Sequence, residues 1–414
     1  MKYRAGRPDI RKILLSVGDT LTQHAPLLEG LSEPSSSTVL SAALPNWASR
    51  LSNLRELEFS DGKTLADESV RNLLHAHCPH LCELRFYSST GDDSDHNLAA
   101  LIGGMPENTL THFENISSCG IGAETLLALN SHGQSLASLK LALDEDGILA
   151  LRYLQGCTKI RTLAITALRR SVDLKATQND VFIEIIEWLS HCDLLDEITF
   201  DGIISAPDLL LPVLLNKSVK LRELQIHAKE GSLYLVKDHH DFHQALRQQT
   251  SLRSLSLRAD PEGITRDDQE LLVNSFCCLL NLEELNLGRI SEHFGDEQIK
   301  LLAEYLPKLT SLNVAGYGSD AIWSSLAKLK YLKLLTFSGL TAFTYEGILE
   351  FTSQLGPGNS ELAINVDMAE TESMIPEDLQ DKVRDAIAAK VAGKFEYQPL
   401  RGKLWWSAKT GELV

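Results

Sequence analysis

The densest set of potential metal ligands in this chain lies at 75–82, where the sequence reads HAHCPHLC. Imidazole and thiolate groups are ligands that zinc prefers, so this run could hold a zinc ion. Structural zinc sites favour paired CxxC or HxxxH spacings, and neither occurs here. Cys78 and Pro79 also stand where a helical pattern ends, and Leu81 and Leu84 must point into a core. Packing explains the run better than metal binding, and we expect no metal and no cofactor.

The motifs of familiar catalytic sites are missing from the sequence. There is no GxSxG elbow, no HExxH pair and no GxxxxGK phosphate loop, and GYGSD at 316–320 lacks a third glycine. The run KDHHDFH at 237–243 is interpreted as a solvated loop that enters a helix. Cys277 and Cys278 lie at an apolar helix end, which favours buried thiols over reactive ones. We therefore expect no catalytic residue and no enzymatic activity.

A repeat determines where all of these residues lie. The pattern apolar-x-x-apolar-x-apolar begins eleven times, at Leu54, Leu81, Leu110, Leu136, Ile160, Leu195, Leu221, Leu252, Leu282, Leu309 and Leu332. The first and last starts are 278 residues apart, so the ten steps average 27.8 residues. Of the 33 anchor positions, 32 are apolar. The exception is Asn115, where we expect the neighbouring Ile116 to take the inward position.

Apolar residues at helical spacing follow the anchors, as in ADESVRNLLHAHCPHL at 66–81 and DEQIKLLAEYLPKL at 296–309. Each unit is thus a short strand followed by a helix, and stacked units share one core. The period and the LxxLxL pattern are typical of the larger, ribonuclease-inhibitor-like leucine-rich repeats. The sequence predicts an α/β leucine-rich-repeat solenoid of eleven to twelve repeats of about 28 residues, an arc with a parallel β-sheet on its concave face and helices on its convex face.

Four segments follow from this pattern. We expect an N-terminal helical or capping segment at 1–53, with helices over 9–28 and 35–54, and the solenoid at 54–374. A C-terminal capping helix should occupy 375–394, because its Pro-Glu-Asp start is typical of a helix beginning. A terminal helix with one polar face would seal the exposed edge of the core. The tail at 395–414 has no clear period, and we expect it to be partly disordered.

The charge balance argues against a nucleic-acid partner. The sequence has 39 basic and 56 acidic residues, a formal net charge of -17, which repels polyanions. The longest apolar run near the N-terminus is 13–15, too short for a secretory signal or a membrane span. Seven scattered cysteines do not form a secreted disulfide framework. We expect a monomer that stays in the cytoplasm, the nucleus or both and binds no membrane.

The junctions between helices and strands read HAHCPHLCELRF, QGCTKIRTLAI, SHCDLLDEITF and EYLPKLTSLNV, which resemble the Cys/Pro-bearing repeats of F-box leucine-rich-repeat proteins. The stretches LGPGN at 355–359 and IAAKVAGKFEYQPLR at 387–401 resemble a filamentous-fungal family of these proteins. That resemblance implies a substrate-recognition subunit of an SCF-type ubiquitin ligase, in which an F-box grips the ligase adaptor and the repeats hold the target. No Leu-Pro-x-Glu start typical of an F-box occurs before the repeats, so ligase attachment has no support in these residues.

The concave face is the predicted binding surface, because the third and fifth positions of each unit point away from the core. The candidate partner-binding residues are Glu56, Glu58, Glu83, Arg85, Glu197, Glu223, Gln225, Glu284 and Asn286, with Glu114, Lys140 and Arg258 at further outward positions. One interpretation is an acidic ledge for a basic segment of a partner, tested by charge reversal at Glu197 and Glu223. The other is that exposed strand positions simply take charged residues.

Two longer steps of the repeat hold extra loop, at 167–180 and 227–241. Insertions in repeat proteins map to loops and often to binding surfaces, and the first of these is locally basic through Arg169, Arg170 and Lys175. The sequence thus favours a non-enzymatic recognition module that holds a protein target on its concave face, similar to the substrate-binding part of an SCF-type ligase. The alternative is a free-standing scaffold or inhibitor without a ubiquitin-ligase role.

Overall fold

The computed structural model describes residues 30–32, 51–88, 93–117, 120–228, 231–370 and 374–399. The chain divides between Val219 and Lys220 into two compact units, which we describe separately as unit 1 and unit 2. The expected helix over 9–28 and most of the one over 35–54 lie outside the described residues, as does the tail beyond 399.

Unit 1 contains a parallel sheet in which each strand pairs with the next one along the chain. Its strands are β1 (Gly30–Ser32), β2 (Glu56–Asp61), β3 (Glu83–Ser88), β4 (His112–Asn115), β5 (Ser138–Leu143), β6 (Thr162–Ala167) and β7 (Glu197–Asp201). Its helices are α4 (Glu68–His77), α5 (Ser94–Gly103), α6 (Ala123–Leu129), α7 (Glu145–Leu149), α8 (Leu174–Thr177), α9 (Asn179–Ser190) and α10 (Ala206–Leu215), with 3-10 turns η3 (Gly62–Ala66), η4 (Asn130–His132) and η5 (Ala150–Leu154).

In unit 2 the parallel strands have the order β8-β9-β10-β11-β13-β14-β15, and the short β12 pairs with β13. Its strands are β8 (Glu223–His227), β9 (Ser254–Leu257), β10 (Glu284–Asn286), β11 (Ser311–Val314), β12 (Gly318–Ser319), β13 (Leu334–Ala342), β14 (Ala363–Ala369) and β15 (Lys394–Pro399). Its helices are α11 (His240–Ala245), α12 (Arg266–Cys277), α13 (Asp296–Tyr305), α14 (Trp323–Leu326), α15 (Tyr345–Gln354) and α16 (Glu377–Val391), with 3-10 turns η6 (Val236–Asp238), η7 (Leu246–Gln248), η8 (Gly288–Ser291), η9 (Asp320–Ile322) and η10 (Pro357–Asn359).

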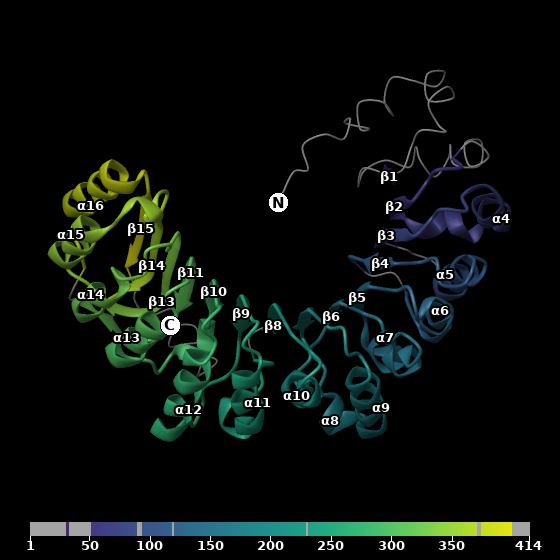
Figure 1. Cartoon of the computed structure of the whole chain (residues 1–414), viewed down its shortest axis with the longest axis horizontal. Coiled ribbons are helices and arrows are strands. Elements are labelled where there is room, and N and C mark those ends of the chain that lie inside the picture. The colour runs from purple at the N-terminus through teal and green to yellow at the C-terminus, as the bar shows by residue number, and fades with distance from the viewer. Residues whose placement is uncertain are drawn as a thin grey trace, which may run out of the picture. The chain divides into compact units, whose positions relative to one another are not determined.

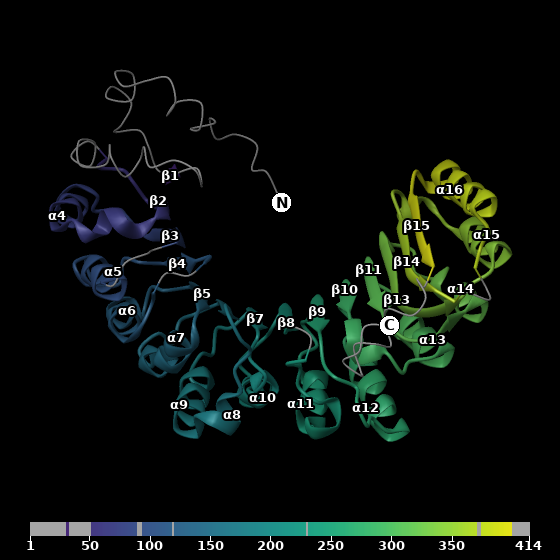
Figure 2. The ribbon, with the colours of Figure 1, turned by 180° about the vertical axis from the view of Figure 1, so that it is seen from behind.

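The α/β leucine-rich-repeat solenoid is confirmed. Each of the eleven predicted units supplies one strand, and every one of these strands begins two residues after the first anchor of its unit. In each unit the helices lie along one side of the sheet (Figures 1 and 2). No described helix covers the other side, which we call the open face.

The leucine anchors form the core between sheet and helices. Leu54, Leu57 and Leu84 in unit 1 and Leu221 and Leu224 in unit 2 are fully buried. Alternation along each strand sends the residues between the anchors to the open face. In both LRELEF and LRELQI the leucines therefore point into the core and the glutamates between them point to the open face.

Asn115 departs from the expectation. Its side chain keeps the inward position and is buried, whereas Ile116 is 44% exposed. The buried amide is satisfied because its Nδ2 donates to the Ala142 carbonyl (2.7 Å) and its Oδ1 accepts from the Ala142 N–H (3.0 Å). Ile116 does not take over the anchor, since the side-chain amide extends the pairing of β4 with β5 in place of backbone groups.

The sheets also continue where no strand was expected. Residues 30–32 of the N-terminal segment form β1, and residues 394–399, at the start of the supposed tail, form β15. The helix expected to end the solenoid is α16, which lies between β14 and β15 and packs on α15. It is thus the helix of a further repeat and is followed by another strand. The anchor pattern did not predict β14, because Glu361, a charged residue with a left-handed φ of 64°, stands at the first anchor position of this strand.

Carboxylates from one repeat cap the helix of the next. Asp95 of α5 accepts from the backbone N–H groups of Gly122 (2.8 Å), Thr125 (2.9 Å) and Glu124 (3.0 Å) at the start of α6. Gly122 itself has no side chain to serve as a cap, and a Cβ there would lie 2.7 Å from an Asp95 carboxylate oxygen.

In unit 2, two further aspartates reach the following repeat. Asp296 accepts from the Ser319 N–H (2.8 Å), and Asp320 accepts from the Thr344 N–H (3.0 Å) at the beginning of α15. Each of these bonds satisfies a helix-start donor that would otherwise be unpaired. Within the described residues, no helix is both long enough and apolar enough to cross a membrane.

Candidate recognition surface

All nine candidate partner-binding residues lie on the open faces. The side chains of Glu284 and Asn286 are exposed and the other seven are half-buried, whereas the anchors between them are buried. The structure brings Glu56, Glu58, Glu83 and Arg85 together on β2 and β3, in register with one another. Glu197 belongs to unit 1 and Glu223 to unit 2.

Arg85 is the centre of a charged network on the open face of unit 1. Its guanidinium pairs with Glu56, with Glu114 at 3.4 Å and with Glu83 at 3.7 Å, and Lys140 approaches Glu114 at 4.0 Å. We call these five residues the Arg85 cluster. Ion pairs at such half-exposed sites stabilise a protein by roughly 0–1 kcal/mol, so the cluster organises the face more than it stabilises the fold.

Glu58 lies across from Arg85 in the register of β2 and β3. It forms no ion pair or hydrogen bond with any described residue. Together with the Arg85 cluster it brings four carboxylates and two cations to one patch, an excess of two negative charges. The acidic character expected from the sequence is therefore present, but most of it is internally paired.

Glu197 and Glu223 have local partners on their own units. The Thr162 hydroxyl donates to Glu197 (3.1 Å), and the Gln225 amide donates to Glu223 (2.5 Å). On the same strand, His227 Nε2 lies 3.1 Å from the side-chain oxygen of Gln225. Gln225 is thus held between an acidic and an imidazole neighbour.

Unit 2 carries a row of uncharged polar side chains, of which only Asn286 is among the candidates predicted from the sequence. Asn286 accepts from Asn313 Nδ2 (3.1 Å), and Asn365 Nδ2 donates to the Thr336 hydroxyl (3.4 Å) on neighbouring strands. These residues occupy the fifth position of successive units, or its equivalent on β14. The signal was in the sequence, as amide and hydroxyl residues recurring at one register position.

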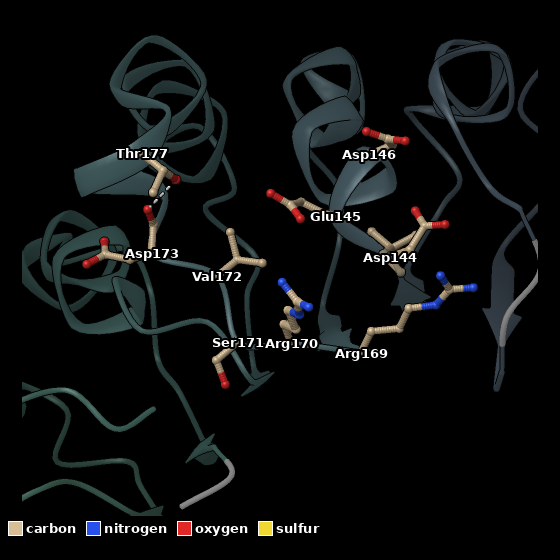
Figure 3. Close-up of a pocket in the computed structure, with 10 residues that line it drawn as sticks. Asp144, Glu145, Asp146, Arg169, Arg170, Ser171, Val172, Asp173 and Thr177 are labelled. Atoms are coloured by element: carbon tan, nitrogen blue, oxygen red, sulfur yellow. Dashed lines mark hydrogen bonds between the residues drawn. The ribbon is translucent and has the colours of Figure 1, made fainter. Parts of the chain in front are cut away.

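A cavity of about 490 Å³ opens in unit 1 between the loops that follow β5 and β6. We call it the β5–β6 cavity; it is lined by Leu143, Asp144, Glu145, Asp146, Arg169, Arg170, Ser171, Val172, Asp173 and Thr177. In Figure 3 the Arg170 side chain lies below Glu145 and beside Val172, and Arg169 extends below Asp144. The cavity arises from the longer repeat step at 167–180.

The two insertions behave differently. In the first, Lys175 is engaged by Asp208 (2.8 Å), while Arg169 and Arg170 line the cavity. The second packs inward, because Tyr234 is 2% exposed and its ring lies 5.2 Å from that of His239 and 6.2 Å from that of Phe242. Only the first insertion therefore forms an open surface feature.

The histidine and cysteine runs do not converge. His75 Nε2 contacts the Leu101 carbonyl oxygen (2.8 Å), Cys78 is buried at the end of α4, and burial raises the pKa of the Cys78 thiol to about 11. In the second run, His240 pairs with Asp268 (2.5 Å) and His243 is buried in the core rather than solvated. Among the described residues no three His, Cys, Asp or Glu side chains are grouped as metal ligands.

The expectation of buried thiols at 277 and 278 is wrong for Cys278. Phe276 takes the inward phase at the end of α12, so Cys277 is half-buried and Cys278 is exposed. Burial raises the pKa of the Cys277 thiol to about 11, and the neighbouring Cys278 and Glu304 add to the shift. Cys157 and Cys192, at the helix-to-strand junctions, are fully buried, and burial raises the pKa of each to about 12.

No family model matches this chain, and no curated protein matches it either. Among solved structures it is similar to the yeast complex of Rad7 and Elc1, at 15% identity over 90% of this chain and 97% of that chain, with a TM-score of 0.47. It is also similar to the leucine-rich repeat-containing protein LegL7 of Legionella pneumophila, at 14% identity over 72% and 89%, with a TM-score of 0.37. A third similarity is to TLR13 bound to ssRNA13, at 11% identity over 77% and 50%, with a TM-score of 0.33. At such identities the likeness concerns the repeat fold alone.

Proposed function

We propose that this protein is a non-enzymatic recognition module that binds a protein target on the open face of unit 1. The observation that carries the proposal is the patch formed by the Arg85 cluster and Glu58. The patch is half-exposed, lies on rigid strands and carries two more negative than positive charges.

A basic segment of the partner fits this patch best. Glu58 offers a carboxylate without a partner in the described structure, and an incoming Lys or Arg can also compete with Arg85 for Glu83 at 3.7 Å. The net charge of -17 adds a long-range attraction for cations. Complementary charges of this kind raise the association rate and make it sensitive to salt.

Attachment to an SCF-type ubiquitin ligase is a narrower proposal, which rests on the resemblance of 355–359 and 387–401 to the fungal F-box family. Both stretches have packing roles here. The buried Asn359 amide donates to the carbonyls of Leu329 (2.9 Å) and Leu332 (3.2 Å), and 387–399 span the end of α16 and β15. These contacts favour, as a second candidate, a free-standing scaffold that shares only the fold with that family.

Site-directed crosslinking tests the proposal. A photo-reactive amino acid replaces Glu58 on the open face or, as the matched control, Glu124 on helix α6, and the protein is irradiated in cells. We expect a defined adduct from position 58 and none from position 124, and Glu83→Lys in the position-58 protein should abolish it. Equal adducts from both positions would contradict recognition on the open face.

The same crosslinked sample separates the two candidates. A cullin-ligase adaptor that co-purifies with the adduct supports the ligase role, and its absence in the presence of a specific adduct supports the scaffold. Irradiation of the purified protein in cell extract at low and at elevated salt distinguishes a charge-dependent contact from an apolar one, because only the former weakens with ionic strength.

A further inference from the structure

Two arginine side chains that make no stabilising contact with the rest of the described structure line the β5–β6 cavity. Arg169 and Arg170 are exposed, and neither forms an ion pair or hydrogen bond with any other described residue. Lys175 of the same loop is paired with Asp208 at 2.8 Å, so partners are within reach of this segment. Each of the two guanidinium groups that line the cavity can bind a carboxylate through two N–H donors.

Three carboxylates, those of Asp144, Glu145 and Asp146, come from the loop after β5, and Asp173 lies on the same loop as the two arginines. Asp144 Oδ1 accepts from the Gly147 N–H (3.0 Å), and Asp173 Oδ1 accepts from the Ala176 N–H (3.2 Å), so these two cap short helices. Glu145 and Asp146 are exposed and have no such bond in the described structure. They are therefore available to a cation that enters the cavity.

The charge balance selects the kind of ligand. Four carboxylates and two guanidinium groups line the cavity, an excess of two negative charges, so a simple anion is repelled overall. A simple cation would leave both guanidinium groups unsatisfied. A ligand with one carboxylate and at least one positive group can pair with both the guanidinium groups and the carboxylates.

We propose that the β5–β6 cavity binds a basic amino acid residue by both of its ends. Its α-carboxylate lies against Arg169 and Arg170, and its side-chain cation lies against Glu145 and Asp146. The residue is either free or the C-terminal residue of a polypeptide, since both present the same groups. The cavity volume of about 490 Å³ falls in the range of small-ligand sites.

This site is separate from the Arg85 cluster in the residues it uses, and its ligand does not depend on the function proposed for the open face. A failure of open-face crosslinking leaves the cavity proposal intact, and the reverse also holds.

Calorimetric titration of the full-length protein with three probes tests the proposal. The probes are L-arginine, Nα-acetyl-L-arginine, which mimics a C-terminal residue, and L-argininamide, which lacks the carboxylate. We expect L-argininamide to bind at least about tenfold more weakly than the better of the other two, because it cannot use the guanidinium pair. Saturable binding of Nα-acetyl-L-arginine supports the proposal with a C-terminal residue as the source, and binding of L-arginine alone supports it with a free amino acid.

Three variants localise the binding. Arg169→Ala with Arg170→Ala should weaken binding at least about tenfold and remove the preference over L-argininamide. Glu145→Gln with Asp146→Asn should weaken binding but keep that preference. The matched control is Arg161→Ala, an exposed arginine next to the start of β6, which should bind as the unaltered protein does.

Thermal melting of each variant checks that the fold is intact, which we expect because all five replaced side chains are exposed. The proposal is overturned if no probe binds at millimolar concentration, if L-argininamide binds as well as Nα-acetyl-L-arginine and L-arginine, or if Arg161→Ala weakens binding as much as the double arginine variant.

Discussion

At the scale of single residues, two buried polar side chains show how differently this core treats polarity. Asn115 is 3% exposed and its amide is paired on both sides with Ala142. His243 is fully buried, and neither of its ring nitrogens has a hydrogen-bond partner in the described structure. A satisfied buried amide stabilises a fold, whereas an unsatisfied imidazole costs free energy.

Restoring the repeat consensus at position 115 should therefore destabilise the protein. Asn115→Leu matches the apolar pattern but leaves the N–H and C=O of Ala142 without their side-chain partners. We expect a loss of about 1–3 kcal/mol in the free energy of unfolding, measured by urea denaturation. Ile116→Ala, at the exposed neighbour, is the control and should change stability by less than about 0.5 kcal/mol. An Asn115→Leu variant as stable as the unaltered protein would show that the amide pairing is dispensable.

His243 predicts a dependence of stability on pH. Burial, and then the charges of His239 and His240, lower the pKa of His243 from 6.5 to about 3, and Asp268 opposes that shift. The unfolded chain thus binds the proton more readily than the folded chain. The contribution of neutral His243 to the free energy of unfolding is therefore fully present above about pH 6.5 and falls as the pH drops toward 3. Between pH 7.5 and 5.0 the loss from this one group is about 2 kcal/mol.

His243→Leu should remove that part of the pH dependence. Urea denaturation at pH 7.5 and 5.0 should show that the free energy of unfolding falls less for this variant than for the unaltered protein at the lower pH. His80→Leu, at an exposed histidine, is the control and should show no such difference. A stability difference that is the same at both pH values would mean that His243 has the same pKa in the folded and unfolded states.

At the scale of elements, α6 is capped by a side chain of the preceding repeat. α6 begins at Gly122, which cannot cap it, and Asp95 of the preceding repeat supplies the missing acceptor to three backbone N–H groups. Side-chain caps of this kind stabilise a helix start by about 1 kcal/mol. Adjacent repeats are thus joined by directed polar contacts as well as by shared apolar surface.

Removal of this cap has a measurable effect. Asp95→Ala should lower the free energy of unfolding by about 1–2 kcal/mol, and the amide protons of 122–125 should exchange faster with solvent. Asp93→Ala is a matched control, because Asp93 stands at the start of α5 and makes no side-chain cap bond. If both variants lose the same stability, the contribution of Asp95 is its charge near a helix start and not its hydrogen bonds.

At the scale of the whole molecule, periodicity predicted most of the architecture. Eleven strand starts follow from the anchors alone, because the inward positions of a repeat must be apolar. β14 and β15 did not follow. Glu361 stands at the first anchor of β14, and the matching position before β15 is Ala392, a small residue with a left-handed φ of 55° at the end of α16. Position 115 was misjudged because hydrogen bonding to a neighbouring strand can replace apolar burial, which a hydropathy pattern cannot show.

The candidate surface was predictable in outline only. Alternation gave the outward direction of Glu56 and Arg85, but which charges pair depends on strand register and side-chain conformation, as the three contacts of Arg85 show. The insertion at 167–180 was visible as extra length. Its conversion into a cavity beside Glu145 depends on how two loops pack, and that information is spread over residues more than twenty positions apart.

The three capping aspartates all lie on the N-terminal side of the backbone groups that they cap. Asp95, Asp296 and Asp320 each precede the backbone groups that they receive. A ribosome therefore delivers every such acceptor before the helix start that needs it, so each new turn can be closed as soon as it emerges. Truncation has unequal consequences for the same reason. A deletion from the C-terminal end that keeps α6 also keeps its cap, whereas a deletion from the N-terminal end that removes Asp95 and keeps α6 leaves that helix uncapped.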